Sequence, residues 1–158
     1  MKRIFVPVAL AIAAVLVFAV VNATAQEKQK SKGGAIHVIE HATTDQVTNG
    51  SATDSAGNVP TFANDVFNDA DKNKVGTDQG YCVRIVVGKA WECNWTTFLP
   101  DGQITVEGPF SDTGNTVLSI TGGTGKYRNA RGWMELKYHN PAGTEFDFVF
   151  HLHGSGKD

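Results

Sequence analysis

Residues 102–132 carry the pattern that decides the fold, and they read GQITVEGPFSDTGNTVLSITGGTGKYRNARG. Ile104 and Val106 alternate with polar residues, which is typical of a strand with one apolar face. Gly108-Pro109 is expected to end that strand, because proline cannot donate to a ladder. Residues 117–120 predict a second strand, and the glycines that follow allow a tight turn.

The glycine cluster at 122–125 does not fit a nucleotide site. A phosphate-binding loop would need a glycine at position 120 and Ser or Thr after the lysine, where this chain has Ile120 and Tyr127. We therefore interpret the cluster as a turn between two strands.

Two segments carry a family resemblance: GQITVEGPF at 102–110 and ITGGTGKYRNARG at 120–132. Together they resemble the core of allene oxide cyclases, and the second also resembles dirigent proteins. The resemblance runs from about residue 36 to the C-terminus and implies a closed barrel of eight antiparallel strands. The count of about eight short strands, with no convincing amphipathic helix, also favours an all-β barrel. A sandwich is the physical alternative.

Alternating apolar residues and turn residues place the strands along the chain. Phe146, Phe148, Phe150 and Leu152 alternate on one face of the last strand. The polar segments 43–60 and 68–79 predict loops, the first with a weak hairpin at Asn49-Gly50. We expect strands at 35–42, 62–67, 81–86, 89–98, 133–139 and 145–153, besides the two in the opening stretch.

The first 25 residues have the pattern of a secretory signal peptide. Lys2 and Arg3 precede an apolar run over residues 4–21, and Ala23-Thr24-Ala25 fits a cleavage site. A membrane anchor is the alternative, because the run is nearly long enough to span a bilayer. We therefore predict a secreted protein with a signal peptide at 1–25, a flexible polar leader at 26–34 and one barrel domain at 35–158.

Charge narrows the range of partners. The chain has a formal net charge of −2 and no long basic run. We therefore expect neither nucleic acid nor, after signal cleavage, a membrane as a partner. Asp147, His151 and His153 share one face of the last strand, but we interpret them as solvated exterior positions. We predict no metal and no cofactor.

The chain has two cysteines, Cys82 and Cys93, on strands joined by a short turn. A register that pairs Arg84 with Trp91 would place them opposite each other on one face. Export favours oxidation, so we predict a Cys82–Cys93 disulfide. The alternative is a free thiol at Cys82, since a cysteine in the matching segment of plant allene oxide cyclases lies in the barrel cavity.

The resemblance also marks two candidate catalytic residues. Glu40 resembles the cavity glutamate that the cyclases use to steer charge, and Asn64 resembles the asparagine that helps to hold a water at the epoxide oxygen. Burial inside the barrel should raise the pKa of Glu40. The alternatives are a surface glutamate and a turn-capping amide. The chain departs from the cyclases at Ala42, where they have a second asparagine, at Phe110, where they have tyrosine, and in lacking a proline at 43–49.

These features predict a barrel that binds a small apolar ligand and steers its cyclisation or coupling. The candidate cavity wall is Phe110, Phe146, Phe148 and Phe150. The alternatives are a true isomerase, a cyclase acting on an oxygenated unsaturated lipid, and a secreted structural barrel with a filled interior. The sequence leaves open whether the chain is an enzyme. Family members often form trimers, so the resemblance allows a homotrimer.

Overall fold

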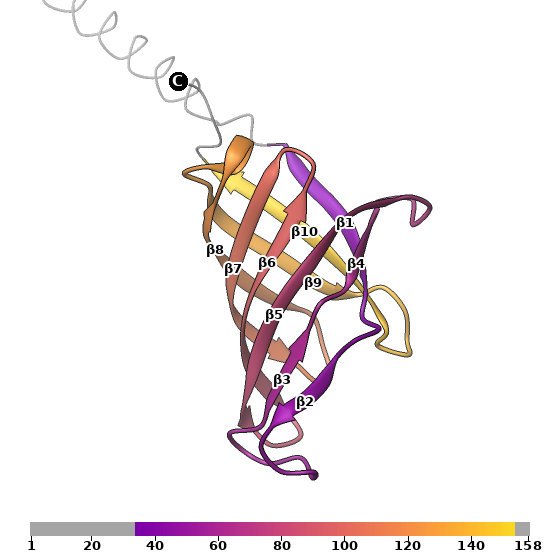
Figure 1. The fold of residues 1–158 in the computed structure, drawn as a ribbon, viewed down its shortest axis with the longest axis vertical. Helices are drawn as coiled ribbons and strands as arrows, with labels where there is room; N and C mark the ends of the chain where they lie inside the picture. The colour runs from indigo at the N-terminus through magenta and orange to yellow at the C-terminus, as the bar shows by residue number, and fades with distance from the viewer. Residues whose placement is uncertain (1–33, 154–158) are drawn as a thin grey trace, which may run out of the picture. The chain divides into compact units, whose positions relative to one another are not determined.

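Ten β-strands and one short 3-10 turn make up residues 34–153, the part of the chain that the computed structural model describes (Figure 1). The predicted signal peptide, the leader up to residue 33 and residues 154–158 lie outside the described residues. No helix among the described residues is long and apolar enough to cross a membrane. The elements are β1 (Ala35–His41), β2 (Gln46–Asn49), β3 (Val59–Phe62), β4 (Asp65–Asn68), β5 (Lys74–Val86), β6 (Ala90–Leu99), β7 (Gly102–Ser111), β8 (Thr116–Gly123), η1 (Gly125–Tyr127), β9 (Arg131–Tyr138) and β10 (Glu145–His153).

Antiparallel pairing joins eight of these strands into a ring in the order β5-β4-β1-β10-β9-β8-β7-β6, which the β5–β6 ladder closes. The fold is therefore the closed eight-stranded barrel that the sequence predicted. The β2–β3 hairpin extends the wall: β4 pairs with β5 near Thr77, and β3 pairs with it at Gly80 and Tyr81. Figure 1 shows this hairpin below β1 and β4. β1–β2 and β3–β4 thus behave as two interrupted strands.

The interruption corrects the strand expected at 62–67. Ala63 and Asn64 separate β3 from β4 because Asn64 pairs its backbone with Asp78 on β5, with N···O distances of 3.1 and 2.9 Å. Its side-chain oxygen accepts from the backbone N–H groups of Thr43 and Thr44, each at 3.0 Å. One asparagine therefore fixes both breaks in the wall, between β1 and β2 and between β3 and β4.

The two polar segments expected to be loops contain strands. Residues 46–49 and 59–60 belong to the β2–β3 hairpin, whose loop spans residues 50–58 in place of a tight Asn49-Gly50 turn. Residues 74–79 belong to β5, where Thr77, Asp78 and Gln79 pair with β6. Ladder hydrogen bonds come from the backbone, so a polar stretch can form a strand once its neighbour is in place.

β7 continues through Gly108-Pro109 to Ser111, contrary to the expected stop. β8 pairs with β7 only as far as Glu107, so beyond that point β7 pairs with β6 alone. A strand with a single neighbour tolerates a residue that lacks an N–H. Pro109 therefore stands on a local sheet edge.

Alternate residues along the strands point into the barrel and form its core. Phe146, Phe148, Phe150 and Leu152 all point inward from β10, as expected, and all are buried. Burying side chains of this size stabilises by about 1.5–3 kcal/mol each. The predicted disulfide is confirmed: Cys82 pairs with Cys93 in the β5–β6 ladder at a Cα–Cα distance of 4.0 Å, and both are buried.

Candidate functional site

A cavity of about 310 Å³ lies in the part of the barrel that β2 and β3 help to wall. Six aromatic residues line it: Phe62, Trp91, Trp95, Phe110, Phe146 and Phe148. Both disulfide cysteines also line it, so neither offers a free thiol to a ligand. A volume of this size lies at the lower end of the range of small-molecule sites.

Three of the four predicted wall residues, Phe110, Phe146 and Phe148, line the cavity, and Phe150 does not. Phe150 lies two residues further along β10, paired with Ile36 and Met134, and is fully buried. Its ring meets Phe148 edge-on at 6.3 Å. Phe150 therefore belongs to the filled part of the barrel.

Glu40 points into the barrel from β1 and lines the cavity, with 5% of its surface exposed. Burial raises the pKa of Glu40 well above its ordinary range, and the nearby carboxylate of Asp78 raises it further. The surface alternative is thus excluded by the geometry. This shift favours the neutral form of Glu40, and a neutral carboxyl can donate a hydrogen bond.

Asn64 joins the carboxyl groups of two separate segments. Its Nδ2 donates to Glu40 Oε1 at 2.8 Å and to Asp45 Oδ1 at 2.7 Å. Its Oδ1 accepts from the Thr43 and Thr44 backbone and from Thr44 Oγ1. These donors and acceptors fix the orientation of the amide. Asn64 therefore caps the broken strand and also positions Glu40.

Asp78 completes the acidic group from β5. It is 1% exposed, and burial raises its pKa to about 7. Its Oδ1 accepts from the Asn64 backbone N–H, whereas Oδ2 has no N–H or other donor among the described residues. The interaction between the two carboxyls favours the proton on Glu40 and the charge on Asp78. The protonation of one carboxyl therefore depends on that of the other.

Asp45 lines the cavity from the segment between β1 and β2. The residue as a whole is exposed, but its carboxyl faces the cavity, where desolvation raises its pKa. The sequence analysis named neither Asp45 nor Asp78. Asp78 could have been found, because it lies two and four residues before Gly80 and Cys82 on the same strand face. No sequence signal marked Asp45.

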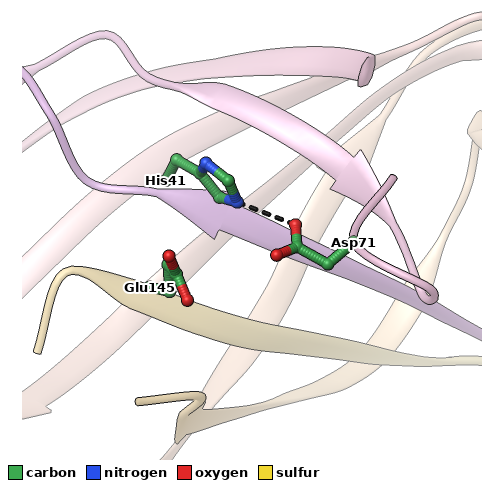
Figure 2. A group of neighbouring side chains, drawn as sticks. All are labelled: His41, Asp71 and Glu145. Atoms are coloured by element: carbon green, nitrogen blue, oxygen red, sulfur yellow. Dashed lines mark hydrogen bonds and ion pairs between the residues drawn. The ribbon is translucent and has the colours of Figure 1, made fainter. Parts of the chain in front are cut away.

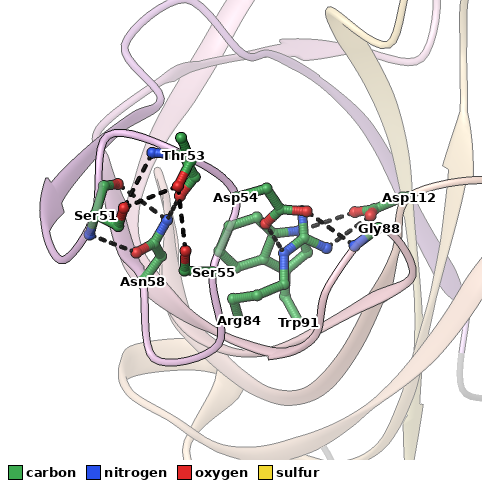
Figure 3. Close-up of polar contacts among 9 residues, drawn as sticks. All are labelled: Ser51, Thr53, Asp54, Ser55, Asn58, Arg84, Gly88, Trp91 and Asp112. Carbon is green, nitrogen blue, oxygen red and sulfur yellow. Dashed lines mark hydrogen bonds and ion pairs between the residues drawn. The ribbon is translucent and has the colours of Figure 1, made fainter.

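A second polar cluster holds the loop between β2 and β3 against the barrel (Figure 3). Arg84 donates from Nε to Asp54 at 2.7 Å and from Nη1 to Asp112 at 2.6 Å. Its guanidinium lies 3.6 Å from the ring centroid of Trp91, whose Nε1–H donates to Asp112. Gly88 N–H donates to Asp54. The carboxylates of Asp54 and Asp112 thus both bind the guanidinium of Arg84.

Asn58 organises the same loop from within. Its Oδ1 accepts from Ser51 N–H at 2.7 Å, and its Nδ2 donates to the carbonyl oxygens of Ser51 and Thr53. Figure 3 shows this network beside the Arg84 cluster. The long hairpin loop is therefore tied both to itself and to the β5–β6 turn.

On the outer face, His41, Asp71 and Glu145 converge (Figure 2), with their ligand atoms within 4.8 Å of one another. His41 Nε2 lies 2.7 Å from Asp71 Oδ1, and the His41 ring stacks on Phe67. One nitrogen and two carboxylates could hold a divalent metal. The existing contacts already give the group a structural role, because they tie the β4–β5 turn to β1.

Asp147 and His151, which share one face of β10, bind to different partners. Asp147 hydrogen-bonds to His37 and His139, whereas His151 hydrogen-bonds to Glu135. They do not form a common metal site with His153 among the described residues.

Comparison with known proteins identifies the family of β-barrels to which this chain belongs. Residues 36–150 match the allene oxide cyclase barrel like domain, and the chain belongs to this family. Three solved structures show the same fold. A pyocyanin demethylase is 20% identical with a TM-score of 0.59, and the match covers 74% of this chain and 100% of that one. A pterocarpan synthase dirigent protein is 22% identical with a TM-score of 0.62 and coverages of 76% and 90%. An exo-specific intermolecular Diels-Alderase is 18% identical with a TM-score of 0.58 and coverages of 77% and 100%.

Proposed function

We propose that this protein binds a small, largely apolar ligand in the barrel cavity and steers its cyclisation or coupling. The observation that carries the proposal is a buried carboxyl, Glu40, in the wall of an aromatic cavity. Perturbed carboxyls in clefts are typical of functional sites. The presence of this cavity argues against the alternative of a structural barrel with a filled interior.

The chemistry follows from shape and charge. The aromatic walls would hold the ligand in a folded conformation, so that reacting atoms meet with little further loss of entropy. Glu40, positioned by Asn64, would in its neutral form donate a hydrogen bond to an oxygen of the ligand. Asp45 and Asp78 would stabilise positive charge that develops during ring closure.

Known structures of this fold support ring-forming or coupling chemistry as the class of reaction. They include the Diels-Alderase and the pterocarpan synthase dirigent protein described above. The departures at Ala42 and Phe110 favour binding and steering over the allene oxide cyclase reaction. A true isomerase on an oxygenated lipid is the alternative, and Glu40→Gln separates the two. It should slow turnover with little change in affinity if the barrel is an isomerase.

We also propose that the protein is secreted after cleavage behind Ala25. The disulfide is compatible with an oxidising compartment. Intact mass of the exported protein tests this, and a chain that still begins at Met1 would support an anchor. Native mass spectrometry of the same sample would report a homotrimer, which the family resemblance allows.

Ligand binding is tested with N-phenyl-1-naphthylamine, a neutral dye that fluoresces in apolar sites. We expect enhancement with the wild type and its loss in Ala42→Phe, because Ala42 lines the cavity and a phenyl ring would fill it. Ala70→Phe, at an exposed position, is the matched control and should bind as the wild type does. Enhancement that persists in Ala42→Phe, or none in the wild type, would overturn the proposal.

A further inference from the structure

The charged side chains that line the cavity are all acidic. Glu40 and Asp45 line it directly, and Gln46 is the uncharged polar residue beside them. Asp78 lies behind Glu40 and interacts with it electrostatically. No lysine, arginine or histidine lines the cavity in the part of the chain that the structure describes. A ligand therefore meets two carboxyls, with a third beyond the lining, and no cationic side chain.

The guanidinium of Arg84, which stacks on a cavity-lining tryptophan, already has its charge neutralised. Arg84, on the same face of β5 as Cys82, forms ion pairs with both Asp54 and Asp112. Because these two carboxylates offset the single positive charge of Arg84, the cluster cannot attract an anionic ligand. The Arg84 guanidinium also stacks on Trp91, which lines the cavity. The cluster shows that an aromatic face of this barrel accepts a cation.

These features determine how the charge of a ligand affects its binding free energy. A carboxylate ligand would lose its hydration among like charges and find no cationic partner. A ring cation would gain attraction from the carboxylates and from the electron-rich faces of the aromatic walls. A neutral ring of the same shape would gain only the apolar contact.

We propose that the cavity selects ring compounds that carry a positive charge, such as aromatic quaternary ammonium ions, and rejects carboxylates of the same shape. The inference rests on the proposed ligand-handling function and names its ligand class. It differs from a fatty-acid site, which would need a basic group for the carboxylate.

The pH dependence of binding follows from the groups that face Asp78. Glu40 from β1 and Asp45 beyond it are the titratable neighbours. Asn64, between β3 and β4, and Thr97, opposite Asp78 on β6, do not titrate. Because the pKa of Asp78 is about 7, its negative charge grows between pH 6 and pH 8. Affinity for a cation should therefore rise severalfold over that interval, and affinity for a neutral ligand should not.

Three naphthalene probes of matched size test the charge preference: 2-naphthyltrimethylammonium, its neutral isostere 2-tert-butylnaphthalene and 2-naphthoate. The readout is the indole N–H signals of the exported protein in ¹⁵N NMR spectra. Trp91 and Trp95 line the cavity, whereas Trp133 is exposed on β9 and serves as an internal control. At pH 7.5 we expect the ammonium to bind at least tenfold more tightly than the carboxylate and more tightly than the isostere.

Two substitutions assign the effect to the cavity. Asp45→Asn should reduce the preference for the ammonium severalfold with little change for the neutral isostere. Glu107→Gln, which removes an exposed carboxylate from β7, should leave the preference unchanged. Preference unaffected by Asp45→Asn, or equally reduced by Glu107→Gln, would overturn the assignment.

The outcomes separate this inference from the function on which it rests. A ratio below tenfold, or a neutral isostere that binds as tightly as the cation, would overturn the charge preference and leave ligand binding standing. If none of the probes, nor N-phenyl-1-naphthylamine, shifts the Trp91 and Trp95 signals, the ligand-handling function itself fails. Shifts confined to Trp133 would place binding outside the barrel and overturn both.

Discussion

Asn64 donates one side-chain hydrogen bond to Glu40 at 2.8 Å and thereby holds a buried carboxyl at the point where two strands of the barrel wall are broken. The same amide donates to Asp45 and caps the segment at Thr43 and Thr44. The Asn64 side chain thus stabilises the broken wall of the barrel and also positions the Glu40 carboxyl in the candidate site. Loss of this side chain should disturb both.

Asn64→Ala should lower the free energy of unfolding by about 2–3 kcal/mol, because it leaves buried carboxyls and backbone amides without partners. The pKa of Glu40 should rise further, since the Asn64 hydrogen bond lowers it. Urea unfolding measures the first effect, and ¹³C NMR of the glutamate carboxyl measures the second. Asn140→Ala, which removes an amide from the exposed β9–β10 turn, should change stability by less than about 0.5 kcal/mol. Equal effects of the two substitutions would contradict the role of Asn64.

Asp78 makes folding stability depend on pH in an unusual direction. Its pKa is about 7 in the folded protein, above its ordinary value, so the folded state binds more protons than the unfolded state between about pH 4 and pH 7. Its contribution therefore favours the folded state at low pH and is lost as pH rises towards 7. The total change is up to about 4 kcal/mol.

Asp78→Asn removes this titration, so the stability difference between the variant and the wild type should shift in favour of the variant between pH 5 and pH 8. Urea unfolding at these pH values measures it. Asp65→Asn, at an exposed ion pair with Lys74, is the control and should show no such shift. A pH-independent difference for Asp78→Asn would mean that Asp78 is ionised throughout.

The Cys82–Cys93 disulfide should stabilise the barrel by about 2–3 kcal/mol, because it closes a loop with a sequence separation of 11 residues. Reduction should therefore lower Tm by roughly 10 °C. Calorimetry with and without a reductant measures the shift. A Cys82→Ala/Cys93→Ala variant should show no response to the reductant, and an unchanged Tm in the reduced wild type would refute the prediction.

Arg84→Ala should cost about 2–4 kcal/mol of stability, because it strips a buried guanidinium from Asp54 and Asp112 and from the ring of Trp91. Chemical denaturation measures the loss. Lys126→Ala breaks an exposed ion pair with Asp101 and should cost much less than Arg84→Ala, because solvent screens that pair. Similar costs for the two would show that the Arg84 cluster is only a surface contact.

Much of the fold could be predicted because its signals are local. Alternation on the last strand placed Phe146, Phe148 and Phe150 on one face, and hairpin register brought Cys82 opposite Cys93. Period-two patterning specifies a face whatever the partner strand is. The family resemblance marked Glu40 and Asn64 as candidate residues, but the 2.8 Å hydrogen bond between them follows from the fold.

The strand boundaries at Pro109 and Lys74 could not be predicted from local signals. Proline and polar runs suggest an end to a strand, but the outcome depends on which neighbour is present at that position. β7 has a single neighbour at Pro109, and β5 has a complete partner in β6 from Thr77 onward. Pairing over long sequence distances overrides local propensity in such cases.

The sequence by itself determined the alternating faces of the strands and the Cys82–Cys93 pairing, because each depends on residue spacing within a strand or one hairpin, and the family resemblance implied the closed barrel. The sequence left open whether Glu40 points inward, and the tertiary structure decided that. Only the tertiary structure decided that Asp45, Asn64 and Asp78 surround Glu40. These residues come from segments that the sequence marks as polar, and they meet because two strands break at the same level of the wall. The acidity of the cavity arises there, since desolvation and mutual repulsion act only once the chain has closed around the carboxyls.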